Sequence, residues 1–136
     1  MRKQSQVSTE YMMIIGFATV ISLPLLIIYY DFTSSSRDSV SANQALSIAR
    51  NVVDASESVY YLGTPSQTVL KVNIPEGVQS INLSNREVVF KMKTAQGINE
   101  IVQVSTVNIT GSISGSKGIH TITIVAAGSS VQISSD

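Results

Sequence analysis

The feature that most constrains this chain is an uninterrupted apolar segment close to its N-terminus. No charged residue occurs between Tyr11 and Tyr30, a window of twenty residues. As an α-helix, a segment of this length rises about 30 Å, which matches the hydrocarbon core of a bilayer. Because the window is apolar on every face, a helix there must lie in lipid or pack against other apolar helices.

Local signals set the shape and the end of this predicted helix. Pro24 lies inside the apolar run, where its missing backbone donor and its clash with the preceding turn predict a bend around residues 20–24. Residues 31–62 are first polar and serine-rich and then, from residue 45, carry apolar side chains at three-and-four spacing. That spacing predicts an amphipathic helix. Gly63, followed by Thr64-Pro65, is a strong stop signal.

The remainder of the chain has the alternation typical of β-strands. From residue 67 onward the period is two, and β-branched residues are frequent. This pattern predicts strands near residues 68–74, 78–83, 87–93, 98–109, 119–126 and 130–134. The predicted fold class is therefore α+β: a long N-terminal apolar helix, residues 6–62, followed by a small antiparallel β-sandwich or barrel-like head domain, residues 63–136. We expect the amphipathic stretch to cover one face of the sheet.

Composition and spacing argue against several function classes. The formal net charge is zero and no Lys/Arg cluster marks a nucleic-acid surface. The chain has no cysteine, and its one histidine, His120, lies in an alternating strand where we expect it to face solvent. No pair of carboxylates, Ser/His/Asp set or group of metal ligands occurs at a useful spacing. We therefore predict no enzymatic activity, no cofactor, no metal and no small-molecule substrate.

The order of polar and apolar residues at the N-terminus is informative. Residues 1–10, MRKQSQVSTE, are polar and begin with a basic pair, and the apolar run follows them. A secretory signal peptide instead places its apolar stretch before the cleavage site and loses it. The motif Gln6-Val7-Ser8-Thr9-Glu10-Tyr11 resembles the class III signal peptide of type IV pilins, in the Gln-x-Ser-x-Glu-Tyr form characteristic of euryarchaeal pilins. IPEGV at 74–78 and NITG at 108–111 look like parts of the head of such proteins.

This resemblance implies a processing event and an assembly contact. A membrane-embedded prepilin peptidase would cut between Ser5 and Gln6, remove the leader of residues 1–5 and leave the apolar helix on the mature chain. Gln6 would become the N-terminus, and Glu10 would become the fifth mature residue. In the family, the glutamate corresponding to Glu10 pairs with the N-terminal amine of a neighbouring subunit. Glycine usually precedes the cut, whereas this chain has Ser5, which is also small.

Simpler alternatives exist for the same residues. The apolar helix alone would serve as an uncleaved signal anchor. Glu10 lies in the first turn of the expected mature helix, where the helix dipole by itself favours an anion.

The flanking charges predict the orientation of the chain. Arg2 and Lys3 precede the apolar segment, and the positive-inside rule places them in the cytoplasm. The precursor is then a membrane protein with a cytoplasmic N-terminus and an extracellular head, and the mature form lies in a cell-surface filament. In an outward head, the sequons at Asn82 and Asn108 are candidate N-glycosylation sites.

Our leading hypothesis is a structural pilin subunit that assembles through its apolar helix into an archaeal type IV pilus-like filament serving adhesion. Its partners would be copies of itself or other pilins, the prepilin peptidase, and the membrane before assembly. One alternative is a single-pass accessory, stator-like component of a surface appendage, which absence of cleavage before Gln6 would favour. A membrane-tethered binding module for sugar or an S-layer is a third possibility, and it predicts a ligand site on the head.

Overall fold

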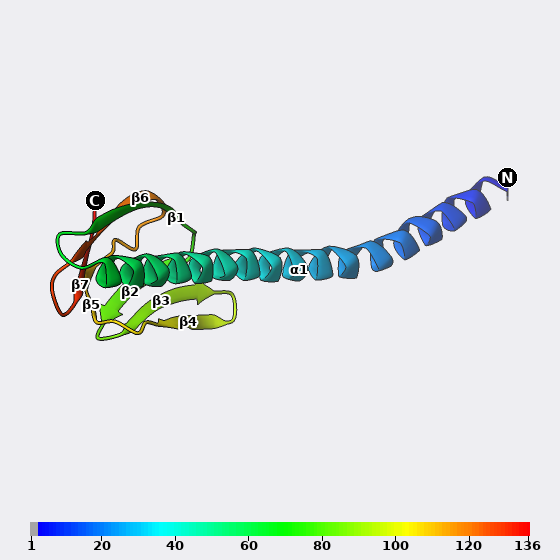
Figure 1. The fold of residues 1–136 in the computed structure, drawn as a ribbon. Helices are drawn as coiled ribbons and strands as arrows, with labels where there is room; N and C mark the ends of the chain where they lie inside the picture. Colours follow the sequence, from blue (N-terminus) through cyan, green and yellow to red (C-terminus); the bar gives the residue numbers. More distant parts are fainter. Residues whose placement is uncertain (1–2) are drawn as a thin grey trace. The chain divides into compact units, whose positions relative to one another are not determined.

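The computed structural model describes residues 3–136, and describes side chains from residue 8 onward. A single α-helix, α1 (Lys3–Leu62), precedes seven strands (Figure 1). The chain divides into two compact units, the first ending at Ser36 and the second beginning at Arg37. The boundary falls within α1, so each unit is described by itself.

In the first unit, α1 remains helical through Pro24. The hydroxyl groups of this segment are satisfied within the helix, because Thr19 donates to the Ile15 carbonyl and Ser22 to the Ala18 carbonyl, each at 2.8 Å. Such bonds to the carbonyl four residues earlier let hydroxyl side chains enter an apolar environment without an unpaired donor. Both bonds lie on the N-terminal side of Pro24, which itself lacks a backbone donor.

The second unit contains the head. Its strands are β1 (Gln67–Ile74), β2 (Val78–Ser84), β3 (Glu87–Thr94), β4 (Gly97–Val104), β5 (Ile109–Ser112), β6 (Gly118–Ala126) and β7 (Val131–Ser135). They form a four-stranded sheet in the order β1-β6-β7-β5 and a three-stranded sheet in the order β2-β3-β4. The predicted α+β fold class, a long helix followed by a small β head, is confirmed.

Two details of the sheets differ from the sequence-based expectation. The single strand expected over residues 98–109 is two strands, β4 and β5, which belong to different sheets. The break is fixed by backbone bonds around the β2–β3 turn, where Ser105 N–H donates to Arg86 and Ile109 N–H donates to Asn85. In addition, β5 pairs with β7 in parallel, so the head is not purely antiparallel.

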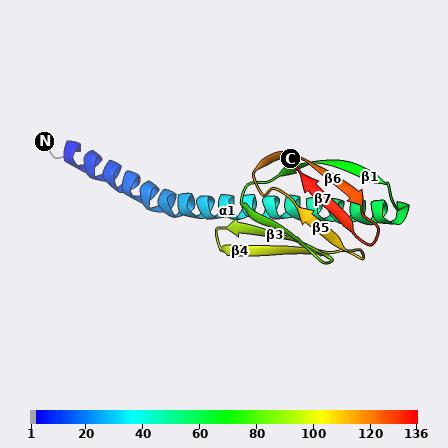
Figure 2. The same cartoon turned by 90° about the vertical axis from the view of Figure 1, so that its left-hand side faces the viewer.

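The core of the second unit is built by α1 and both sheets together. Along the helix, the buried stripe is Ala45, Ile48, Ala49, Val52, Val53, Ser56 and Val59. This stripe confirms the amphipathic prediction, and the C-terminal part of α1 lies alongside the strands (Figures 1 and 2). The buried Ser56 hydroxyl donates to the Val52 carbonyl at 2.6 Å, so it adds no unpaired polar group. Each fully buried Val or Ile contributes roughly 1.5–3 kcal/mol relative to exposure.

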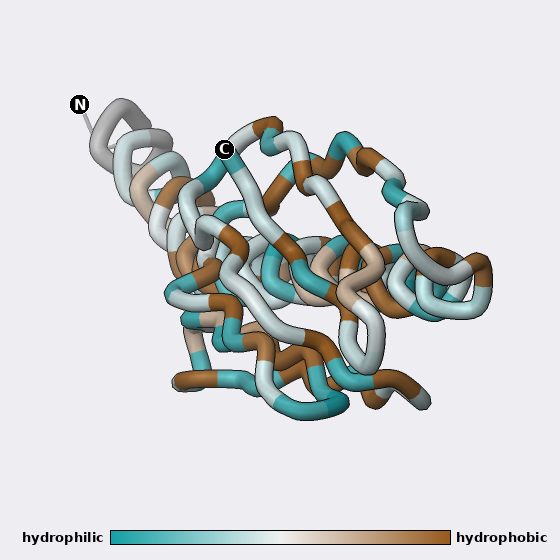
Figure 3. The backbone as a smooth tube through the Cα atoms, turned by 60° about the vertical axis from the view of Figure 1, so that its left-hand side comes forward, coloured by the Kyte–Doolittle hydropathy of each residue, from teal (hydrophilic) through white to brown (hydrophobic). Residues whose placement is uncertain are grey.

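Alternation along the strands supplies the other side of this core. In β3, for example, Val88, Phe90 and Met92 are buried while their neighbours are more exposed. Hydrophobic and hydrophilic residues accordingly alternate along the chain in the head (Figure 3). Most strands therefore bury one row of side chains, as a thin two-sheet head requires, whereas β4 has no fully buried residue.

Candidate functional site

The most unusual surface of the described chain is the apolar part of α1 in the first unit. Large apolar side chains remain uncovered there, from 47% exposed at Ile21 to 79% at Met13. They are Tyr11, Met12, Met13, Ile14, Ile15, Phe17, Val20, Ile21, Leu23, Leu25, Leu26, Ile27, Ile28, Tyr29, Tyr30 and Phe32. We call these residues the bare apolar helix. A continuous apolar surface of this length far exceeds the patches that soluble monomers expose.

This surface fits a bilayer. Among the described residues, α1 is the one helix long and apolar enough to cross a membrane, and its most apolar window is unburied. The helix is therefore a candidate membrane anchor. An apolar hollow lies among Met13, Ile14, Phe17 and Ala18. Its walls are neighbouring side chains of one uncovered helix, so it is an open gap between side chains rather than an enclosed pocket.

The predicted assembly residues lie along this helix. Ser5 and Gln6 belong to the α1 backbone, and their side chains lie outside the described residues. Glu10 is exposed immediately before the bare apolar helix. Pro24 lies within it, and the predicted bend there stays a prediction.

Both sequon asparagines lie on the surface of the head. Asn82 is exposed in the middle of β2, and Asn108 is exposed in the irregular segment just before β5. The Asn108 side-chain oxygen accepts a hydrogen bond from Arg86 Nε at 3.4 Å. Both residues are therefore accessible positions for a covalent modification.

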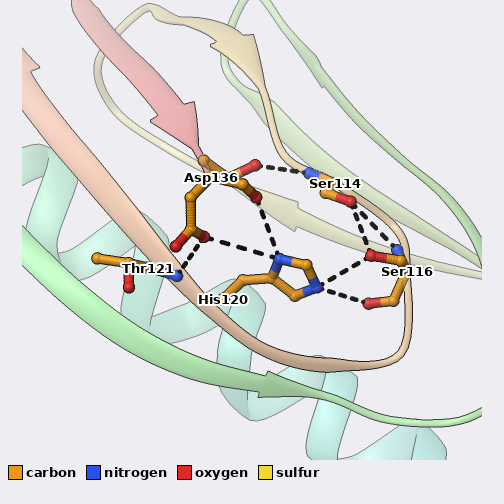
Figure 4. Close-up of polar contacts among 6 residues, drawn as sticks. Ser114, Ser116, His120, Thr121 and Asp136 are labelled. Atoms are coloured by element: carbon orange, nitrogen blue, oxygen red, sulfur yellow. Dashed lines mark hydrogen bonds and ion pairs between the residues drawn. The ribbon is translucent and has the colours of Figure 1, made fainter.

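The head also holds a polar cluster that the sequence did not reveal. His120 was expected to face solvent, and that prediction is wrong because its side chain is only 14% exposed. It shares the inward face of β6 with Ile122 and Ile124. Ser116 and Asp136 lie on either side of its ring (Figure 4). The β6–β7 register pairs Ile122 with Ser135, which brings Asp136 opposite Thr121. The sequence could have indicated this cluster only through a correct prediction of that register.

A Ser/His/Asp combination invites comparison with a catalytic triad, but the geometry differs. His120 Nε2 lies 2.9 Å from the Ser116 carbonyl oxygen, which can only accept a hydrogen bond. That nitrogen therefore carries a proton and cannot take one from the Ser116 hydroxyl, 3.1 Å away. His120 Nδ1 lies 3.8 Å from the Asp136 carboxylate oxygen, too far for a hydrogen bond.

The cluster instead joins the residue that follows β7 to β6 through hydrogen-bond contacts. His120 Nδ1 lies 3.2 Å from the Asp136 carbonyl oxygen, while the Asp136 carboxylate accepts the Thr121 backbone N–H at 2.8 Å. This backbone hydrogen bond holds the pKa of Asp136 below its ordinary value, and the charge of His120 contributes further. Within the described part of the chain, no group of three or more His, Asp or Glu residues is placed to hold a metal ion.

Two carboxylates on α1 tie the three-stranded sheet to the helix, and neither was predicted. Asp38 Oδ2 accepts the Ala95 N–H at 2.8 Å, in the turn between β3 and β4. Glu57 Oε1 accepts the N–H and the hydroxyl of Thr106, each at 2.9 Å, just beyond β4. The Thr106 N–H is the largest cause that lowers the pKa of Glu57. These two contacts fasten both ends of β4 to the helix.

Glu57→Gln is expected to lower the stability of the head at pH 7 by about 1 kcal/mol, because a partly exposed charged acceptor becomes a neutral one. A carboxyl whose folded pKa is lowered stabilises the fold above its unfolded pKa, near the ordinary value of 4.5. That stability is lost as pH falls through the folded pKa. Thermal unfolding of the full chain in detergent from pH 7 to pH 3 should therefore show the two proteins converging in acid. Asp54→Asn, an exposed change on the same helix, serves as the control.

No protein-family model, curated protein or solved structure matches this chain. The bare apolar helix, the N-terminal motif and the sequons therefore carry the functional argument.

Proposed function

We propose that this chain is a structural pilin subunit that assembles through its N-terminal helix into an archaeal type IV pilus-like surface filament. The observation that carries the proposal is the bare apolar helix. It is apolar on all faces, and it belongs to the same continuous α-helix whose C-terminal part is built into the head core. A subunit of this design presents one element for burial and one for display.

The uncovered surface requires two successive environments. Lipid covers all faces of the helix in the precursor, and a bundle of like helices covers all faces after assembly. A flat contact with one partner would leave much of the surface in water. Copies of the same chain are therefore the occupants that best satisfy the whole circumference.

The leader motif supports the same proposal. Cleavage between Ser5 and Gln6 by a prepilin peptidase would free an amine at Gln6, four residues before Glu10. In a filament, the Glu10 carboxylate would pair with the Gln6 amine of a neighbouring subunit. The charge then enters the apolar bundle as a pair, which avoids most of the cost of burying a lone carboxylate.

The proposal also assigns a location and a service. The Arg2-Lys3 pair holds the precursor N-terminus in the cytoplasm, so the head is extracellular and becomes the outer surface of the filament. We propose adhesion as the function of such a filament. Exposure outside the cell would also place the sequons where a glycan can be attached, which would make the head a glycoprotein wherever one is used.

N-terminal sequencing and intact mass measurement test the proposal directly. The chain is purified from native membranes and, separately, from sheared surface filaments. We expect a mature chain beginning at Gln6, or at its pyroglutamate form, and enriched in the filament fraction. A chain that keeps Arg2 and Lys3 and never enters filaments would contradict the proposal. It would favour the accessory, stator-like membrane protein instead, for which a helix of bilayer length is sufficient.

A further inference from the structure

The two sequons of the head differ in how firmly the sheets hold them. In each sequon the acceptor asparagine and the hydroxyl residue are exposed, while the residue between them points inward: Leu83 in the first and Ile109, fully buried, in the second. Exposure therefore does not separate them. The two asparagines differ instead in local secondary structure, because Asn82 lies within β2 and Asn108 lies just before β5.

Asn82 is held inside a long antiparallel ladder. All three residues of its sequon lie in β2, and their partners in β3 are Val89, Val88 and Glu87. The ladder continues on the N-terminal side to the pair Ile81–Phe90, in which both residues are buried. Releasing Asn82 from this ladder would therefore disturb the core beneath β2.

Asn108 lies in an irregular segment rather than within a strand. It precedes β5, which has four residues, is the last strand of its sheet and pairs only with β7. That pairing is parallel, which is slightly weaker per residue than antiparallel pairing. Besides the four-residue β5–β7 ladder, three bonds hold the sequon: Asn108 O accepts the Val131 N–H, Ile109 N–H donates to Asn85, and the Thr110 hydroxyl donates to Val131 O. β2 is also the last strand of its sheet, but it has seven residues and pairs in the antiparallel sense. A four-residue strand in parallel pairing opens at a lower free energy than a longer antiparallel one.

The side chain of Asn108 is also suitably presented. Arg86 Nε donates to its oxygen at 3.4 Å, a long hydrogen bond that favours one orientation of the exposed amide. The nitrogen of the same amide points away from this contact, on an exposed residue. That nitrogen is the atom to which an N-linked glycan is joined.

We propose that Asn108, and not Asn82, is the N-glycan acceptor of this protein. The inference rests on the proposed extracellular head. The donor is a lipid-linked oligosaccharide carried on a phosphate or diphosphate. The Asn108 amide nitrogen forms a bond to the anomeric carbon of the first sugar and loses one proton. The bond from that carbon to the phosphate oxygen breaks, and the lipid phosphate leaves with the electron pair.

Trypsin separates the two sites cleanly for mass spectrometry. Cleavage after Lys71 and Arg86 yields residues 72–86 with Asn82, and cleavage after Lys93 and Lys117 yields residues 94–117 with Asn108. The full chain, purified from surface filaments, is digested and its glycopeptides are fragmented to locate the attachment. We expect the glycan mass on residues 94–117 and an unmodified peptide for residues 72–86.

Matched variants distinguish loss of the glycan acceptor from misfolding of the head. Asn108→Gln and Thr110→Ala should each lose the glycan completely, whereas Thr110→Ser, which keeps the hydroxyl, should retain it. Asn82→Gln and Ser84→Ala should leave the intact mass unchanged apart from the substitution. A glycan on residues 72–86 overturns the assignment.

The same samples separate this inference from the proposed function. A mature chain that begins at Gln6, lies in filaments and carries no glycan overturns the glycan assignment and leaves the pilin proposal standing. A head that added protease reaches only after the cells are lysed overturns both. A glycan on Asn108 in a chain that keeps its leader supports the assignment and contradicts the pilin proposal.

Discussion

Glu10→Ala is expected to enter the membrane as the wild-type chain does, yet to appear in surface filaments at least about tenfold less. A charge-assisted hydrogen bond contributes roughly 1.5–3 kcal/mol, and about 1.4 kcal/mol corresponds to a factor of ten in binding. The bare apolar helix is unchanged by the substitution, so insertion into lipid is preserved. What is lost is the partner for the Gln6 amine of the neighbouring subunit, which would then enter the bundle unpaired.

Controls make this result specific. Asp31→Asn removes an exposed carboxylate at the opposite end of the apolar run and should leave filament yield unchanged. Glu10→Asp keeps the charge on a shorter side chain and should restore part of the yield. Filament and membrane fractions are quantified by immunoblotting, and the N-terminal mass of each variant shows whether the leader is removed and whether Gln6 has cyclised. Wild-type filament yield from Glu10→Ala would remove charge pairing from the proposal.

Gly111→Ala is expected to destabilise the head by roughly 3 kcal/mol or more. Gly111 lies in β5 opposite Ile133 of β7, with φ +126°, and a Cβ atom there would clash with the Ile133 carbonyl oxygen. Because the obstacle is backbone, relief requires β5 and β7 to separate, and backbone strain at positive φ adds to the cost. For a unit of about 100 residues, 3 kcal/mol lowers the unfolding midpoint by more than about 10 °C.

Gly118→Ala is the matched control for this prediction. Gly118 has a similar φ of +131°, but a Cβ atom there meets nothing within 4 Å. The control therefore retains the backbone strain and lacks the clash. Thermal unfolding in detergent and hydrogen exchange of β5 and β7 measure both variants. Equal stability losses for the two variants would show that the close approach of β5 to β7 is not what requires glycine.

Local sequence pattern was sufficient to predict the helix and most of the strands. The charge-free window from Tyr11 to Tyr30 predicted an apolar helix, since a single segment in lipid satisfies its own backbone groups only as a helix. Three-and-four spacing over residues 45–62 dictated the stripe that α1 buries, and period-two alternation placed most of the strands. These features follow from residue spacing within short windows of the chain, so their prediction needs no knowledge of the fold.

Only the tertiary structure decided where the chain passes from one sheet to the other. Ser105, Val107 and Ile109 are all buried, so the inward row that includes Ile101 continues unbroken from β4 into β5. Alternation consequently gives no sign of the crossover, which is fixed by the distant carbonyls of Asn85 and Arg86. For the same reason, the sequence did not predict the contact of Glu57 with Thr106 or that of His120 with Asp136. Each joins residues far apart in sequence, and which partners meet depends on strand register and packing rather than on local pattern.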